Sequence, residues 1–317
     1  MIREIRMIAF LMAIIIICLA LGALSAPQRD LSAKQEEHQK RFGAVYMTLN
    51  NPFYEIIDEE IRTEVEKHGD VLLSRDPALS VEKQTEEIED LIREGVSVIF
   101  LNPVDFERMG PALEAARAAH IPVITIDTNV QDSDFVETDN YAAGRACAEH
   151  LLQHADHANI LLLKHSSAHS AVDRITGFRQ MIAGHPGFTI VDEAECDGQL
   201  ERAMPAMQEM LSRHPEADTV MALNDPSALG AMAALESCGR LQSFRVYGVD
   251  GVPETKELIL AGRMTATAAQ SPRRIGRLAA QQAYRLLDGE PVDRLVQLPT
   301  HLWTQENLTP AKTKEWD

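Results

Sequence analysis

Polar and aromatic side chains follow several predicted strands of this sequence. The first strand leads into Asn51, Phe53 and Tyr54, and a later strand ends at Asp127 and Thr128. Segments after further strands hold more residues of this kind: Arg174, Asn224, Asp250 and Gln270. Amides, carboxylates and a guanidinium hydrogen-bond hydroxyl groups, while aromatic rings cover C–H faces. This set of side chains predicts a site for a small polyhydroxylated ligand.

No motif in the sequence predicts catalysis. It contains no GxSxG elbow, GxGxxG turn, Walker loop or HExxH helix. His165 and His169 lie four residues apart with no third ligand nearby, so we interpret them as solvated loop histidines and not as a metal site. The cysteines are widely spaced and lack metal-ligand spacing: Cys18, Cys147, Cys196 and Cys238. We expect no enzyme activity, no metal and no cofactor. The alternative is an enzyme in which paired carboxylates act as general acid and base.

The apolar pattern predicts alternating strands and helices. A buried run at 42–47 precedes helical spacing at 53–69, and this alternation recurs as far as His154. After a polar turn at 154–158 a second series of the same kind begins. Repeated units of this type form parallel sheets covered by helices, and ligands lie beyond the carboxyl ends of the strands.

The length of 317 residues suits two lobes of ordinary size. We assign residues 41–153 and 271–290 to an N-terminal lobe. Residues 154–270 and 291–317 form a C-terminal lobe together with the crossings of a hinge. The predicted fold class is α/β, with two Rossmann-like lobes whose parallel sheets are joined by a multi-segment hinge.

The N-terminus predicts export. Arg3 and Arg6 precede an almost unbroken apolar run at 7–26, which reaches the length of a spanning helix. Small residues favour cleavage of a signal peptide near Ser25, whereas the length of the run suits an uncleaved membrane anchor. Residues 27–40 are polar without periodicity and suit a tether. Both fates of the apolar run stay open.

Composition excludes two further classes of protein. With 45% hydrophobic and 25% charged residues, the chain has enough apolar material to fold, so wholesale disorder is not expected. The formal net charge is −18, and no long block of Lys and Arg reverses that field. Nucleic acid is therefore not an expected partner.

Eight short strings occur in a fixed order along the chain. The first half contains TLNNPFY (48–54), LNP (101–103), IPVITID (121–127) and TDNYAAG (138–144). The second half contains DRITGF (173–178), LNDPSALGA (223–231), YGVDGVPE (247–254) and TATAAQSP (265–272). Together they resemble the periplasmic ribose-binding protein family, the type I sugar-binding proteins that deliver ligand to ABC importers. The resemblance covers nearly all of 42–298.

The resemblance implies a ligand site drawn from both lobes: Asn51, Phe53, Tyr54, Asp127, Arg174, Asn224, Asp250 and Gln270. Three positions depart from the family pattern. Thr128 stands where ribose binders carry Arg, Met47 replaces a small polar residue, and no aromatic wall is found near 196–198. These departures predict a different or larger sugar, or a non-sugar polyol.

Structural roles compete at several of these positions. Asn51 and Asn224 lie at helix starts near a proline, where Asn is a favoured N-cap. Phe53 suits a helix core as well as a ligand wall. Arg174 has Asp173 beside it as a possible ion-pair partner.

The function that the resemblance implies is that of an extracytoplasmic solute-binding protein with the type I periplasmic binding protein fold. It would close on a small sugar or polyol and deliver it to an ABC transporter permease, without a cofactor. The expected location is the periplasm or the outer face of the cytoplasmic membrane. An uncleaved anchor at 7–26 would favour the alternative of a sensor subunit that signals to a kinase or chemoreceptor. Contact with the membrane would come only through this segment.

Overall fold

Two sheets organise the chain in a computed structural model that describes residues 39–128, 130 and 133–316. The predicted leader at 1–26, and the tether as far as residue 38, lie outside the described residues. Within the described part, no helix is both long and apolar enough to cross a membrane. Residues 40–317 form a single compact unit with apolar cores of its own, so this part can be produced without the leader.

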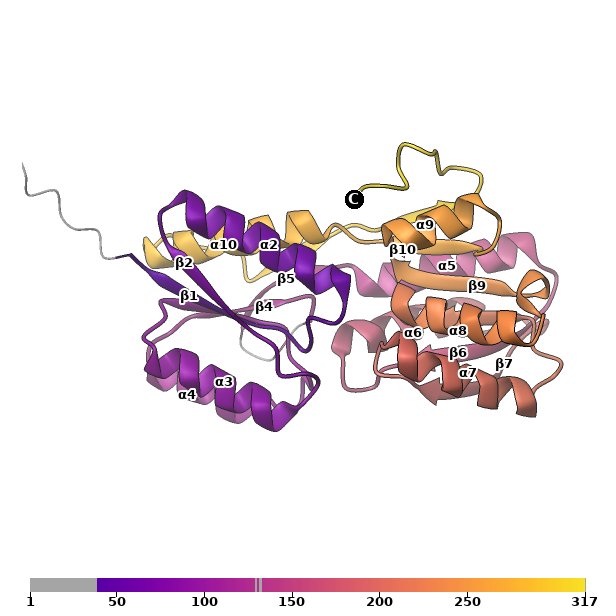
Figure 1. Cartoon of the computed structure of the whole chain (residues 1–317), viewed down its shortest axis with the longest axis horizontal. Helices are drawn as coiled ribbons and strands as arrows, with labels where there is room; N and C mark the ends of the chain where they lie inside the picture. The colour runs from indigo at the N-terminus through magenta and orange to yellow at the C-terminus, as the bar shows by residue number, and fades with distance from the viewer. Residues whose placement is uncertain (1–38, 129, 131–132, 317) are drawn as a thin grey trace, which may run out of the picture. The chain divides into compact units, whose positions relative to one another are not determined.

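The first sheet has the strand order β11-β5-β4-β3-β1-β2, with every pairing parallel. Its strands are β1 (Arg41–Val45), β2 (Val71–Arg75), β3 (Val98–Leu101), β4 (Val123–Ile126), β5 (Asp134–Thr138) and β11 (Leu295–Leu298). Its helices are α2 (Pro52–Lys67), α3 (Val81–Arg93), α4 (Gly110–Ala118) and α10 (Pro272–Leu287). Figure 1 shows α2 and α10 over one face of the sheet, and α3 and α4 over the other.

The second sheet has the order β12-β10-β9-β8-β6-β7, in which only β12 runs antiparallel to its neighbour. Its strands are β6 (Ala158–Lys164), β7 (Phe188–Glu195), β8 (Thr219–Ala222), β9 (Arg245–Asp250), β10 (Ala266–Ala269) and β12 (His301–Thr304). Its helices are α5 (Asn140–His154), α6 (His169–Ile182), α7 (Leu200–Arg213), α8 (Asp225–Ser237) and α9 (Pro253–Leu260), with a short η1 (Leu241–Ser243). Helices α5 and α6 pack together, as do α7 and α8.

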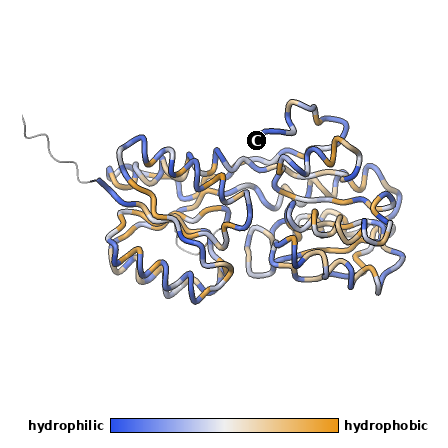
Figure 2. The backbone as a smooth tube through the Cα atoms, viewed as in Figure 1, coloured by the Kyte–Doolittle hydropathy of each residue, from blue (hydrophilic) through white to orange (hydrophobic). Residues whose placement is uncertain are grey.

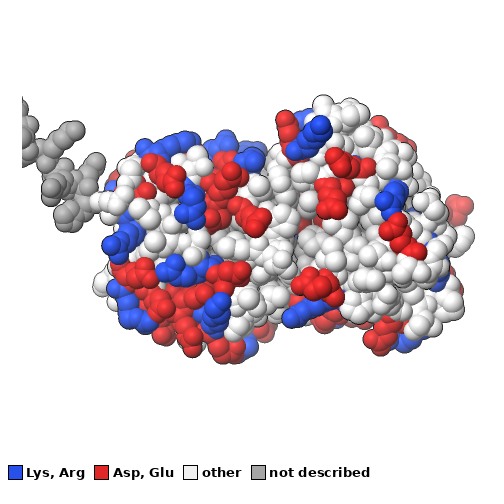
Figure 3. All heavy atoms as spheres, in the orientation of Figure 1, with Lys and Arg blue, Asp and Glu red and all other residues white. Residues whose placement is uncertain are grey.

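Burial follows the apolar pattern of the sequence. The whole of β3 is inaccessible to solvent, as expected for a central strand covered on both faces. Helix α3 begins at the N-cap Ser80 and buries Ile88 and Leu91 while its other faces carry charge. Figure 2 accordingly shows hydrophobic strands flanked by helices of mixed hydropathy, and in Figure 3 acidic side chains gather near α3 and α4.

The chain crosses between the sheets more than once. One crossing leads from β5 into α5, another from β10 into α10, and a third from β11 into β12. The Asp139 N–H donates to the Leu298 carbonyl at 2.8 Å and ties two of these crossings together. The predicted fold class, two α/β lobes with parallel sheets and a multi-segment hinge, is confirmed.

Two elements lie beside a different sheet from the one that the predicted lobe boundaries gave them. Helix α5 was assigned to the N-terminal lobe, but it packs against α6 and contacts β9, β10 and β12. Strand β11 was assigned to the C-terminal lobe, but it pairs with β5. Periodicity identifies an element without specifying its sheet, because either sheet can bury the same apolar face. Which residues move together as a lobe stays a prediction.

The C-terminal segment after β12 touches helices from both sheets. The Lys256 ammonium on α9 donates to the Glu315 carbonyl, which holds the segment near the second sheet. The Trp316 ring then lies 6.3 Å, centroid to centroid, from the ring of Phe53 on α2. The end of the described chain therefore connects α9 with α2.

Helices α5 and α6 approach closely through glycines. A Cβ on Gly144 would lie 1.8 Å from the Arg174 carbonyl oxygen, and one on Gly177 would lie 2.2 Å from the Tyr141 carbonyl oxygen. Real Cβ atoms do not approach an oxygen this closely, so only glycine permits the crossing. The crossing fixes the backbone of Arg174.

We expect Gly144→Ala to lower the free energy of unfolding by about 2 kcal/mol, because the added methyl group forces α5 and α6 apart. Gly110→Ala is the matched control, since a Cβ on Gly110 at the start of α4 meets nothing within 4 Å. Chemical denaturation of both variants measures the difference. Equal stability of the two variants would show that the crossing tolerates a methyl group.

Candidate functional site

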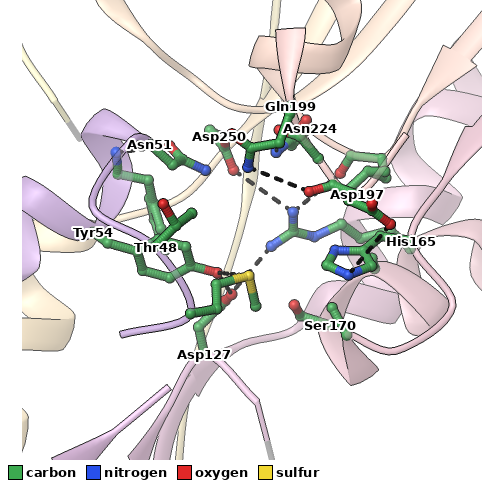
Figure 4. A pocket seen from close by; sticks show the side chains of 17 residues that line it. Thr48, Asn51, Tyr54, Asp127, His165, Ser170, Asp197, Gln199, Asn224 and Asp250 are labelled. Carbon is green, nitrogen blue, oxygen red and sulfur yellow. Dashed lines mark hydrogen bonds and ion pairs between the residues drawn. The ribbon is translucent and has the colours of Figure 1, made fainter. Parts of the chain in front are cut away.

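A narrow cavity lies at the carboxyl ends of strands from both sheets (Figure 4). Its volume is about 20 Å³, on the order of the space that one water molecule occupies. Most of the sequence-predicted residues line it: Asn51, Phe53, Tyr54, Asp127, Arg174, Asn224 and Asp250. They come from elements of both sheets, so the cavity lies between the two sheets.

Arg174 is the central cation of this cavity and is only 3% exposed. Its Nε donates to Asn140 Oδ1 at 2.7 Å, and its Nη1 donates to the Leu223 carbonyl at 3.0 Å. Its Nη2 lies 3.5 Å from Asp127 Oδ1, and Nη1 lies 3.7 Å from Asp250 Oδ1. The guanidinium therefore faces carboxylates from both sheets, and Asp173 instead faces His169 at 3.3 Å.

Asp127 and Asp250, which line the cavity from different sheets, occupy unusual backbone conformations. Asp127 has φ 60° and Asp250 has φ 132°, in the region that L side chains rarely adopt. Such strain persists only where the surroundings hold the chain in place, and it concentrates at functional sites. Burial raises the pKa of both carboxyl groups, and the nearby Arg174 guanidinium opposes that rise.

A buried carboxylate behind the cavity holds the loop after Asp250. Asp225 Oδ2 accepts hydrogen bonds from the Gly251 and Val252 N–H groups at 3.0 and 2.9 Å and from the Thr255 hydroxyl at 2.5 Å. Its Oδ1 accepts from the Thr267 hydroxyl at 2.7 Å. Burial raises the pKa of Asp225 to about 6 although these donors favour the ionised form. Asp225 thus has the structural role that its place at a helix start suggests.

Asn102 has a similar role in the first sheet. Its side chain accepts from the Met47 N–H at 3.2 Å and donates to the Ile126 carbonyl at 3.0 Å, so it joins the ends of β1 and β4. These bonds place Met47 and Asp127 at the same edge. The Tyr54 hydroxyl lies at the same edge and donates to Asp127 Oδ2 at 3.4 Å.

The two asparagines at helix starts are N-caps. Asn51 Oδ1 accepts from the Phe53 N–H at 3.0 Å, and Asn224 Oδ1 accepts from the Ser227 N–H at 3.0 Å. Both residues also line the cavity, so capping uses the carbonyl oxygen and orients the rest of the amide. Phe53 is 1% exposed and packs on Tyr54 and Trp316, so it has a core role at the cavity edge.

The profile of the periplasmic binding protein domain matches residues 42–291 of this chain. The chain belongs to the periplasmic binding protein family. The ribose import binding protein of Salmonella typhimurium is 32% identical over 253 residues, covering 78% of this chain and 85% of that protein. The ribose import binding protein of Bacillus subtilis is 30% identical over 303 residues, covering 92% and 98%.

Solved structures of periplasmic binding proteins have the same fold. An ABC transporter solute-binding protein from Mycobacterium smegmatis with bound glycerol has a TM-score of 0.80 and 35% identity, covering 85% of this chain and 95% of that one. A solute-binding protein from Bacillus halodurans with bound myo-inositol has a TM-score of 0.78 and 25% identity, covering 85% and 96%. The resemblance seen in the sequence motifs is therefore confirmed.

Two of the predicted site residues do not line the cavity of this family member. Thr128 is buried, and its hydroxyl contacts the Ser170 hydroxyl at 3.5 Å. Gln270 is buried behind Asp250, and its Nε2 donates to Asp250 Oδ1 at 2.7 Å. Both residues contact groups that line the cavity, and whether they contact ligand stays a prediction.

The wall contributed by the second sheet includes residues that the site prediction omitted: His165, Ser170, Asp197 and Gln199. The interpretation of His165 as a solvated histidine was wrong, because its ring is only 5% exposed. Its Nε2 lies 2.9 Å from the Ser167 hydroxyl, and burial lowers its pKa. His165 directly follows β6 at the carboxyl edge of the sheet, which is the signal that could have identified it.

Direct contacts join the two walls of the cavity. The Asn50 amide donates to Gln199 Oε1 at 3.1 Å, and the Phe106 N–H donates to the Ser167 carbonyl at 3.2 Å. The Phe106 ring meets His169 edge to face at 5.1 Å. These contacts link the segments that carry the two walls.

A further acidic group lies next to the hinge. Glu137 on β5 accepts from Gln297 Nε2 at 3.0 Å. Burial, followed by the nearby carboxylates Asp127, Asp173 and Asp139, raises the pKa of Glu137 to about 7 from an ordinary 4.5. The folded protein therefore holds a proton here over a pH range where the unfolded chain releases it.

Because that proton is lost on unfolding, the contribution of Glu137 to the stability of the folded protein should fall as the pH rises from 4.5 to about 7. Glu137→Gln has no proton to release, so we expect its stability relative to wild type to increase across this range. Denaturant titrations at several pH values measure this difference. Glu86→Gln, at an exposed position of α3, is the control for loss of a carboxylate as such, and a difference for Glu137→Gln that does not change with pH would contradict the assignment.

Proposed function

We propose that this protein binds a small sugar or polyol between its two sheets outside the cytoplasmic membrane and delivers it to an ABC importer. The observation that carries this proposal is the position of the buried Arg174 guanidinium between the strand-end carboxylates Asp127 and Asp250. Hydroxyl groups bind such charged partners by charge-assisted, directional hydrogen bonds.

The proposed mechanism is closure of the two sheets around the ligand. A cavity of about 20 Å³ cannot admit a sugar, so the walls must separate for ligand to enter. The contacts of Asn50 with Gln199 and of Phe106 with Ser167 would then break and form again. The crossings near Asp139, Gln270 and Leu298 are the segments that would bend.

The relatives support binding and transport over catalysis. Two of them are named as ribose import binding proteins, and two similar solved structures of solute-binding proteins contain glycerol and myo-inositol. We therefore propose that the protein is not an enzyme and that it is exported, as the apolar run at 7–26 predicts. None of these relatives supports the alternative of a sensor subunit.

The proposed ligand contacts fall into two groups. One group lines the cavity and would contact the ligand directly: Asn51, Tyr54, Asp127, Arg174, Asn224 and Asp250. The remaining predicted residues would act at its edge or through a neighbour: Phe53, Thr128 and Gln270.

A thermal-shift screen of residues 40–317 against pentoses, hexoses, inositols and linear polyols tests the ligand class. A ligand that binds only the folded state at 100 times its Kd adds about 2.7 kcal/mol of stability, so we expect a clear rise in Tm with at least one compound. A flat screen confirmed by calorimetry would remove small sugars and polyols as ligands. Oligosaccharides and nucleosides would then be screened in the same way.

Arg174→Ala and Asp127→Ala should each weaken binding of the compound found by about 2 kcal/mol or more, roughly 30-fold in Kd, because each leaves buried polar partners unpaired. Titration calorimetry measures the affinities, with Asp288→Ala at the exposed end of α10 as the control. Circular dichroism checks that each variant is folded. Unchanged affinity in both folded variants would place the ligand elsewhere.

A further inference from the structure

The cavity between the sheets carries more negative than positive charge. Arg174 is the only Lys or Arg among the described residues that line it, whereas Asp127, Asp197 and Asp250 all do. Asp197 forms an ion pair with Arg202 outside the cavity wall, so its charge is compensated. Asp127 and Asp250 therefore share a single guanidinium.

The surroundings of Asp250 add to this imbalance. Asp225 lies behind it, with its oxygens already bonded to the Gly251 and Val252 N–H groups and to hydroxyls. Arg174 in turn has donors committed to Asn140 Oδ1 and the Leu223 carbonyl. These bonds hold the guanidinium 3.5 Å from Asp127 Oδ1 and 3.7 Å from Asp250 Oδ1, which is too far for a strong hydrogen bond to either carboxylate.

Buried oxygen atoms in the cavity and directly behind it have no hydrogen-bond donor among the described residues. They are Asp127 Oδ1, Asp250 Oδ2 and Gln270 Oε1, each on a residue that is at most 1% exposed. Gln270 uses its amide N–H on Asp250 Oδ1, so its carbonyl oxygen remains an acceptor only. A buried acceptor without a donor costs free energy, and a ligand that supplies N–H or O–H groups removes that cost.

We propose that the preferred ligand is an amino-substituted sugar or polyol, whose ammonium group is bound by the Asp250 carboxylate while its hydroxyls face Arg174. An ammonium group carries three hydrogen-bond donors and a full positive charge, whereas a hydroxyl group carries one donor and no charge. It thus donates to the Asp250 oxygen that has no donor and compensates the charge of the second carboxylate. This inference rests on the proposed binding of a polyol in the same cavity.

The titration behaviour of the carboxylates agrees with this geometry. Burial raises the pKa of Asp127 and Asp250, since one guanidinium does not offset the desolvation of both. Without a cationic ligand, the second carboxylate can remain buried by holding a proton. A bound ammonium takes the place of that proton.

The test compares neutral compounds with their amino-deoxy counterparts by titration calorimetry at pH 7 on residues 40–317. The pairs are myo-inositol with an amino-deoxy inositol, ribose with 2-amino-2-deoxyribose, and glucose with glucosamine. In at least one pair we expect the amino compound to bind about tenfold or more tightly than its neutral partner.

Asp250→Asn should bring the two affinities of that pair within about threefold of each other, because the carboxylate that selects the charge is gone. Using the ratio within a pair cancels a general loss of affinity in the variant. Asp288→Asn removes the same charge at the exposed end of α10 and should leave the ratio unchanged.

The outcomes separate the two proposals. If neutral compounds bind as tightly as amino compounds in every pair, the preference for an amine is wrong and the proposed function stands. If no member of any pair binds, both proposals fail. An amine preference that persists in Asp250→Asn would also overturn the assignment of the ammonium to Asp250.

Discussion

The arrangement of this protein depends on one buried guanidinium that faces carboxylates from two separate sheets. Arg174 lies 3.5 Å from Asp127 and 3.7 Å from Asp250, in a cavity nearly closed to solvent. Burying these charges is unfavourable unless each is paired with an opposite charge or hydrogen-bonded. A single guanidinium cannot compensate the charges of two carboxylates. The cavity is therefore a place where the fold leaves polar groups incompletely satisfied.

The scaffold holds these charges in position from behind. The glycine contact of α5 with α6 fixes the Arg174 backbone and brings Asn140 onto its Nε. Asp225 fixes the loop after Asp250, and Asn102 joins the ends of the strands beside Asp127. These contacts hold the cavity wall of each lobe rigid. The cavity can therefore open mainly by movement of one lobe relative to the other.

The sequence predicted most of the fold because its apolar periods alternate clearly, as at 42–47 and 53–69. It also identified Asp127, Arg174 and Asp250, since polar residues after buried strands must gather at one edge of a parallel sheet. It did not predict which sheet α5 and β11 lie beside. Periodicity identifies the apolar face of an element but not the sheet against which that face packs. It missed the burial of His165, whose ring lies 2.9 Å from the Ser167 hydroxyl, because a pattern of residue types does not show such a side-chain contact.

The contact of Trp316 with Phe53 has a spectroscopic consequence. The segment that carries Trp316 is held to α9 beside the second sheet, while Phe53 belongs to α2 beside the first. Separation of the lobes would move the indole out of an aromatic environment and into water. Only one other tryptophan, Trp303, contributes to the emission, and it is largely buried within β12. The native fluorescence of this chain would thus report its own opening and closing without an attached dye.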